Sequence, residues 1–192
     1  MRHLLILFLA LTFMIPASAL ADNDKDLFIA AGDNDIAAVM TFIDEGADVN
    51  AMYSDVRMTA LMLAALADCA DAVRLLLENG ADVNLGDLTG FTALTYASES
   101  GGIETIRLLL DHGADVNAMS KFGWNALIWA TEFGHEEAVR LLIDYGAEMD
   151  AIGFEGRTAL AEAVLSYKNG IARLLIEHGA EFEPWQIPLV RE

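Results

Sequence analysis

The histidines are the residues of this chain best suited to metal or acid–base chemistry. His112 and His178 each stand just before a glycine, 66 residues apart, and His135 lies between them. A shared metal needs every ligand atom within about 2 Å of the ion. Residues at the same position in neighbouring packed helices lie roughly 10 Å apart, so histidines on different helices are too far apart to share one ion. We therefore expect these histidines to be structural and expect no metal site.

An acidic residue recurs two positions after a repeated glycine. Calcium prefers about six to eight oxygen ligands gathered at one point, whereas these carboxylates are spread along the chain. A bond from each carboxylate to the backbone of its own turn is the better interpretation, and no cofactor is indicated. The recurring acids are Asp48, Asp82, Asp115, Glu148 and Glu181.

Cys69 is the single cysteine, so it cannot form an internal disulfide. A reactive thiol needs a positive group nearby to lower its pKa, and the nearest basic residue in the following sequence is Arg74. A redox role stays open as the alternative to a structural one. With no converging base, nucleophile and metal set, we expect no catalytic residues and no enzyme.

A five-residue stretch, Gly-Ala-Asp-Val-Asn, is repeated in full three times. It occupies residues 46–50, 80–84 and 113–117, with weaker copies at 146–150 and 179–183. The glycines are 34, 33, 33 and 33 residues apart. A fixed period of this length is typical of stacked repeats, in which no single unit can bury its apolar face alone.

Each unit predicts two short helices. A Thr or Asn, followed by Ala-Leu, suits the N-cap of the first helix, and apolar residues at spacings of three and four give the second helix one buried stripe. The repeated glycine suits the end of the second helix, where a positive φ is common. The expected N-caps are Thr59, Thr92, Asn125 and Thr158, and the expected solvent-facing arginines are Arg74, Arg107, Arg140 and Arg173.

The chain resembles the ankyrin repeat family. The family's Thr-Pro-Leu-His-x-Ala motif reads Thr92-Ala93-Leu94-Thr95-Tyr96-Ala97 here, and its trailing Gly-Ala-Asp-Val-Asn-Ala is complete at residues 113–118. The resemblance implies an all-α solenoid of about five helix-turn-helix units joined by short β-hairpin loops. Every unit departs from the motif, with Ala in place of Pro and Met62, Thr95, Ile128 or Ala161 in place of His. Losing the His puts in doubt the inter-repeat hydrogen bonds that it usually makes in the family.

The first 21 residues resemble a secretory signal peptide. A short polar start with Arg2 precedes an apolar run over residues 4–15, and small residues before Ala21 suit cleavage after that position. The run has about twelve residues, whereas a membrane-spanning helix needs roughly twenty. We expect a cleaved signal and no stable membrane insertion, with an uncleaved anchor as the alternative, and export to the periplasm or secretion.

The remaining chain, residues 22–192, is predicted to form one repeat domain. Its units are expected at residues 24–50, 51–84, 85–117, 118–150 and 151–183, and residues 184–192 are expected to cover the last unit with Trp185 and Ile187. We name the segments before each N-cap linker 1 (51–58), linker 2 (85–91), linker 3 (118–124) and linker 4 (151–157). Linker 1 has one residue more than the others, which predicts a bulged or lengthened hairpin.

The net charge limits the partners. The full chain carries 11 basic and 30 acidic residues, and removal of residues 1–21 takes away one basic residue, leaving a formal net charge of −20. Such a charge repels nucleic acid and anionic lipid, so neither is expected to bind. A partner attracted by charge should be basic, and we expect a monomer.

The resemblance implies that a protein or peptide binds the hairpin tips and the exposed side of the first helix. Aromatic and Met residues, which interface cores favour, are frequent there. The alternative is that Phe91 and Trp124, at the same phase, only brace their hairpins; Lys121 and Arg157 could orient an acidic group. The candidate residues are Met52, Tyr53, Val56, Met58, Leu88, Phe91, Met119, Lys121, Phe122, Trp124, Phe133, Ile152, Phe154 and Arg157.

Two roles for such a binding module stay open. One is an inhibitor or immunity-type protein that blocks an exported enzyme. The other is a scaffold or chaperone-like helper of exported enzymes under stress. An inhibitor should bind one enzyme stoichiometrically, whereas a helper should bind several clients or unfolded ones. An enzyme is the remote third class, because the sequence shows no convergent titratable groups.

Overall fold

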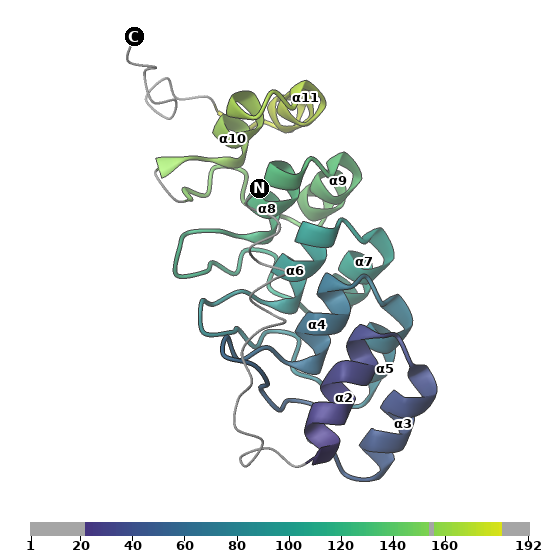
Figure 1. The fold of residues 1–192 in the computed structure, drawn as a ribbon. Coiled ribbons are helices and arrows are strands. Elements are labelled where there is room, and N and C mark those ends of the chain that lie inside the picture. The colour runs from purple at the N-terminus through teal and green to yellow at the C-terminus, as the bar shows by residue number, and fades with distance from the viewer. Residues whose placement is uncertain (1–21, 154–155, 182–192) are drawn as a thin grey trace.

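The chain folds as a single stack of helix pairs. A computed structural model describes residues 22–153 and 156–181, and Figure 1 shows the pairs following one another from α2 and α3 to α10 and α11. Successive first helices pack on one another, as do successive second helices. The predicted all-α solenoid is confirmed. The first helices are α2 (Asp22–Gly32), α4 (Ala60–Leu66), α6 (Ala93–Ser100), α8 (Ala126–Phe133) and α10 (Ala159–Leu165); the second helices are α3 (Ile36–Asp44), α5 (Ala70–Glu78), α7 (Ile103–Asp111), α9 (Glu136–Asp144) and α11 (Asn169–Glu177).

The predicted N-caps begin four of the first helices. The side chains of Thr59 and Asn125 accept the backbone N–H of the residue three positions on, at 3.3 and 2.9 Å, and Thr92 and Thr158 do the same. The leucine two residues after each cap is at most 1% exposed, and burying a Leu contributes about 1.5–3 kcal/mol. Capping and apolar burial therefore set where each unit starts.

The repeated glycines end the second helices in the left-handed region. Their φ angles lie between 85° and 98°. No atom comes within 4 Å of the point where a Cβ would stand at any of the five, so the backbone conformation, and not crowding, favours glycine. These residues are Gly46, Gly80, Gly113, Gly146 and Gly179.

The asparagine closing each full copy of the stretch joins its unit to the next, and we call this series the amide ladder (Asn50, Asn84 and Asn117). Asn84 Oδ1 accepts the Asp115 N–H at 2.8 Å, and its Nδ2 donates to the Gly113 carbonyl at 3.1 Å. Asn50 and Asn117 make the same pair of bonds one unit before and one unit after. Hydrogen bonds thus join successive units although the His of the family's motif is absent.

Three of the five recurring acids bond within their own turns, as predicted. Asp48, Asp82 and Asp115 each accept the backbone N–H of the asparagine two residues on, at 2.9 Å. At the last junction the Asn is replaced by Asp150, which accepts the Glu181 N–H at 3.2 Å and has no amide to donate to a carbonyl. The last unit is therefore held at this edge by one bond where earlier units have two.

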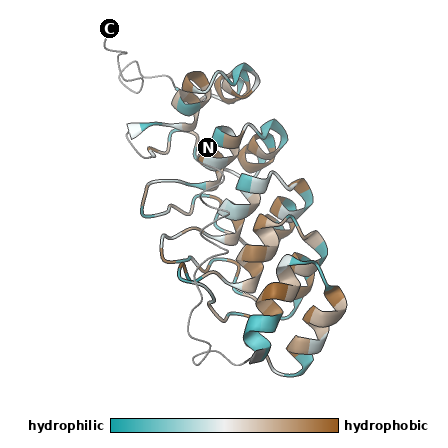
Figure 2. Cartoon of the chain, viewed as in Figure 1, coloured by the Kyte–Doolittle hydropathy of each residue, from teal (hydrophilic) through white to brown (hydrophobic). Residues whose placement is uncertain are grey.

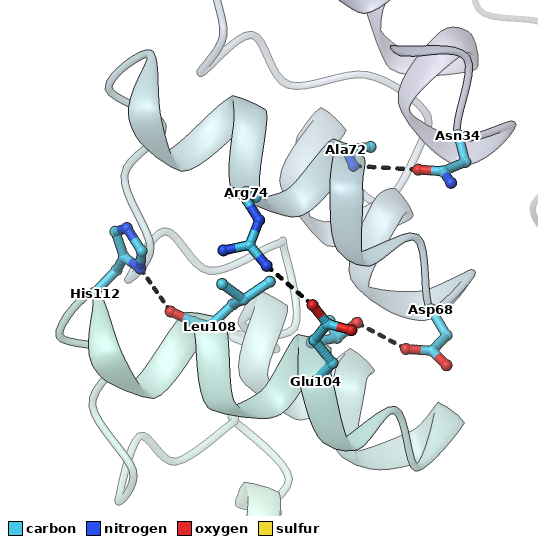
Figure 3. Close-up of polar contacts among 8 residues, drawn as sticks. Asn34, Asp68, Ala72, Arg74, Glu104, Leu108 and His112 are labelled. Atoms are coloured by element: carbon cyan, nitrogen blue, oxygen red, sulfur yellow. Dashed lines mark hydrogen bonds and ion pairs between the residues drawn. The ribbon is translucent and has the colours of Figure 1, made fainter.

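The helix turns carry a second set of inter-repeat bonds. The Asn34 side chain accepts the Ala72 N–H at 3.1 Å (Figure 3). The Asp68 carboxylate accepts the Thr105 hydroxyl of the next unit at 2.7 Å. Figure 3 also shows Arg74 of α5 paired with Glu104 of α7 at 2.9 Å. Because both side chains of that pair are largely exposed, it adds little to stability. Arg74, Arg107, Arg140 and Arg173 all face solvent, as predicted.

Hydrophobic residues, coloured brown in Figure 2, occur on the helices of every layer, whereas the start of α2 is hydrophilic. The first unit contributes Leu27, Ala30 and Val39 to the core, as expected. Linker 1 forms the predicted lengthened hairpin, with a bridge between Tyr53 and Met58. The predicted signal peptide, Phe154 and the expected C-terminal cover over residues 184–192 lie outside the described residues.

Candidate protein-binding surface

Neighbouring linkers are tied to one another at their tips. The Leu88 N–H donates to the Val56 carbonyl at 2.9 Å, and the Lys121 N–H donates to the Thr89 carbonyl at 2.8 Å. The Lys121 ammonium also donates to the Leu88 carbonyl at 2.7 Å. Linkers 1, 2 and 3 therefore form a connected surface along one side of the stack, and we call it the linker surface.

Five of the predicted residues leave large apolar side chains exposed on the linkers. Their exposed fractions run from 37% to 55%. Large apolar side chains that line one edge of a soluble protein are typical of binding surfaces. These residues are Val56, Leu88, Met119, Phe122 and Ile152.

The other predicted residues are more enclosed. Met52, Tyr53, Phe91, Trp124, Phe133 and Arg157 are half-buried. Tyr53 packs on Phe28 of α2, with ring centroids 4.9 Å apart. Met58 is the exception to the expected exposure, because it is only 5% exposed and belongs to the core; the hairpin bridge turns it inward.

Trp129 of α8 is the centre of an aromatic cluster. Its ring lies 4.9 Å from Trp124, 5.3 Å from Phe133 and 5.4 Å from Phe91, measured between centroids. Phe91 also approaches Phe122, at 6.4 Å. Three predicted residues on two linkers and a helix thus meet around one tryptophan, and Phe122 joins them through Phe91. Packing accounts for Phe91 and Trp124, as the bracing alternative expects, and leaves Phe122 half exposed.

A cavity of about 250 Å³ lies between this cluster and linker 1. It is lined by residues of three successive units, because Met58 and Leu66 come from the second unit, Phe91 and Tyr96 from the third and Trp129 from the fourth. Its wall is mostly apolar, with a few polar groups, which is the usual composition of a binding pocket. The remaining lining residues are Ser54, Asp55, Val56, Asp87, Thr89 and Glu99.

Two carboxylates of the cavity differ in their bonding. Asp87 accepts the Tyr96 hydroxyl at 2.7 Å and three further donors from Thr89 and Phe91. Glu99 has no hydrogen-bond or ion-pair partner for its carboxylate among the described residues, and burial raises the pKa of that carboxyl. Burial and the bond to Asp87 raise the pKa of Tyr96 well above its ordinary value. Asp87 is thus a structural anchor of linker 2, whereas the carboxylate of Glu99 has no partner among the described residues.

The two predicted basic residues are already engaged within the chain. Lys121 bonds to linker 2, as described above. Arg157 pairs with Glu162 at 3.3 Å, and Glu162 is largely buried. These contacts hold linkers 3 and 4 against their neighbours.

The remaining chemical candidates serve structural roles in the described chain. His112 and His178 each bond through Nδ1 to the carbonyl four residues before, at 2.7 and 2.8 Å, and His135 bonds to the Glu99 carbonyl at 2.9 Å. Burial, with Asp68 and Asp33 close by, raises the pKa of the Cys69 thiol. No cluster of three potential metal ligands occurs in residues 22–153 and 156–181.

Sequence reasoning missed Tyr96 and Trp129 as site residues. Both stand directly before the last Ala of the repeated motif. This position varies between units, and two other units carry Leu63 and Glu162 there. A large aromatic residue at this motif position, shortly after Phe91 or Trp124 in the sequence, is the signal that could have identified them.

The repeated helix pairs, the linkers and the glycine ends together define a class of protein. The family model for ankyrin repeats matches residues 27–120 and 116–184, so the chain belongs to the ankyrin repeat family. These repeats suggest a protein-interaction module. The family is typically non-enzymatic.

Two curated relatives are similar to part of the chain. A segment of 67 residues, 35% of this chain, is 43% identical to the mitochondrial disaggregases of Bos taurus and Homo sapiens. The match spans 10% and 9% of those proteins, respectively. In the part of the chain that the structure describes, no helix is both long and apolar enough to span a bilayer.

Proposed function

We propose that this protein is an exported, non-catalytic module that binds another protein or a peptide along the linker surface. The observation that carries the proposal is the aromatic cluster beside the cavity, in which the exposed Phe122 packs against Phe91 of the cavity wall. Interface hot spots are enriched in aromatic anchors that surround a pocket. The signal-like residues 1–21 and the excess of acidic residues support export and a basic partner.

The periplasm is the compartment that we favour, with secretion as the alternative. A direct test is the N-terminal sequence of the protein isolated from its native host. Export with cleavage predicts a chain that begins at Asp22. An intact Met1 in a membrane fraction would contradict it.

A chaperone-like helper role has one observation in its favour. The two curated relatives are named disaggregases, and the matched segment covers about a third of this chain. An inhibitor of an exported enzyme is the competing role. Cross-linked affinity capture from the native compartment separates them, because an inhibitor yields one stoichiometric enzyme whereas a helper yields several clients.

Phe122→Ala tests the linker surface itself. The affinity for the captured partner should fall by more than tenfold, since truncating a hot-spot aromatic costs about 2 kcal/mol or more. The free energy of unfolding should change by less than about 0.5 kcal/mol, because half of the side chain is exposed. Titration calorimetry and urea unfolding measure the two quantities.

Met40→Ala is the matched control. Met40 on α3 is exposed to the same extent as Phe122, 51%, but it lies on a second helix, away from the linkers. Its substitution should leave affinity unchanged. Equal losses in both variants, or none in Phe122→Ala, would refute binding at the linker surface.

A further inference from the structure

The cavity at the aromatic cluster is the size of one side chain. Pockets for whole small molecules run from about 300 to 1,000 Å³, and this cavity has about 250 Å³. It opens on the linker surface beside Val56 and contains Met58, Leu66 and Phe91 along its wall. A single projecting side chain with an apolar stem is therefore a better match than a small molecule.

The charge of the cavity has one sign. Asp55, Asp87 and Glu99 line it, and none of its lining residues is basic. Asp87 is held by four hydrogen bonds from neutral donors, so its negative charge is solvated but not neutralised. A cation entering the cavity would gain from all three carboxylates, whereas an anion would be repelled.

Glu99 is the carboxylate placed to receive that cation. It lies on α6 among Tyr96, Trp129 and Leu66, and no described residue pairs with its carboxylate. Loss of solvent raises the pKa of Glu99, so the ionised form is held at a cost to the folded protein. A buried charge without a partner is unfavourable by itself and becomes favourable when a bound cation completes the pair.

The aromatic walls favour a planar cation. The rings of Phe91 and Trp129 lie 5.4 Å apart at 74° to each other, so they offer two differently oriented surfaces beside the acid. A guanidinium stacks on aromatic faces and binds a carboxylate through two parallel N–H bonds, whereas an ammonium does neither as well. A purely apolar side chain would leave Glu99 unpaired.

We propose that this cavity receives an arginine side chain of the partner, with the guanidinium on Glu99 and its stem along Met58, Leu66 and Phe91. The inference rests on the proposed function and adds the chemistry of the anchor. It places the partner's arginine beside linkers 1 and 2, next to the exposed Phe122. Partner recognition then combines one charged anchor with an apolar rim.

The test uses the residue 22–192 chain and the peptide acetyl-Gly-Arg-Gly-amide. The reporter is the Trp129 indole N–H resonance in a proton–nitrogen NMR spectrum, assigned with Trp129→Phe. The peptide should shift this resonance saturably. The citrulline peptide, which keeps the shape of arginine but lacks its charge, should bind at least about tenfold more weakly.

Glu99→Gln should lower the affinity for the arginine peptide about tenfold, because it removes the carboxylate partner and keeps the side-chain volume. Glu78→Gln is the matched control, since it removes one acid from the exposed end of α5 and should leave the affinity unchanged. Affinity in the parent chain should fall as acid protonates Glu99. That fall should be largely absent in Glu99→Gln.

Three results would overturn the arginine anchor. They are equal binding of the citrulline peptide, equal or tighter binding of a leucine peptide, and no shift of the Trp129 resonance at saturating arginine peptide. The proposed function fails separately. If Phe122→Ala weakens the captured partner but Glu99→Gln does not, the linker surface binds a protein without an arginine anchor; if neither variant matters, both proposals fail.

Discussion

Two parts of each unit, the asparagine of the amide ladder and the tip of the linker, follow different plans. Along the amide ladder, Asn50, Asn84 and Asn117 make the same two bonds to the next unit. Along the linker surface, successive tips present Val56, Leu88 and Phe122, which share only their apolar character. Identical contacts fix the spacing and rotation of the stack, and the linker tips are thereby free to differ in every unit.

Trp129→Ala should have the largest effect, and it tests whether the aromatic cluster on the linker side also stabilises the fold. Trp129 belongs to the linker side but touches three other rings, so its removal should lower the free energy of unfolding by about 3 kcal/mol. Urea unfolding followed by circular dichroism measures the loss. A change below about 0.5 kcal/mol would show that the cluster is not part of the packed fold.

Asn84→Ala should destabilise the stack by about 2 kcal/mol, because two inter-unit hydrogen bonds are lost. Asp150→Ala removes one bond at the last junction and should cost about 1 kcal/mol or less. Partner affinity should be unaffected in both. Equal losses in urea unfolding, or a loss of binding in Asn84→Ala, would break the division between a structural edge and a binding edge.

Glu99→Gln should have the smallest effect on stability, and of opposite sign. The folded pKa of Glu99 is raised by burial, so the folded state holds its proton more tightly than the unfolded chain, and ionisation costs stability as pH rises through the folded pKa. The variant should therefore unfold at a higher temperature than the parent at pH 7. The difference should vanish below the unfolded pKa of about 4.3.

Thermal unfolding from pH 4 to pH 8 measures this difference, with Glu78→Gln as the reference. If Glu99→Gln is more stable than the parent and binds the peptide more weakly, then Glu99 serves recognition and lowers the stability of the fold. Lower stability of the variant at pH 7 would mean that Glu99 has a favourable partner in the folded chain.

Much of the fold could be predicted because its determinants are local. Thr59 and Asn125 cap helices through atoms three residues away, and Gly113 needs only its own φ. The amide ladder escaped prediction because its partners lie about 30 residues away. Nothing in the repeated Asn itself indicates whether its side chain bonds within its turn or to the next unit.

The candidate site was predictable only in part. Phe91, Phe122 and Trp124 were identified because they interrupt polar linkers, and the structure brings them together. Trp129 and Tyr96 fill one variable position inside a motif that otherwise consists of framework residues, so only their size could have identified them. The exposure of Met58 was misjudged because the linker 1 hairpin, bridged between Tyr53 and Met58, turns the Met58 side chain into the core.

The cavity draws its wall from the second, third and fourth units. In a linear array, each unit senses its immediate neighbours, so the units can open nearly independently and cooperativity decays along the chain. A ligand side chain held in this cavity would contact the second, third and fourth units at once. Partner binding would then couple the three units more strongly. They would unfold, and exchange their amide protons, as one cooperative unit.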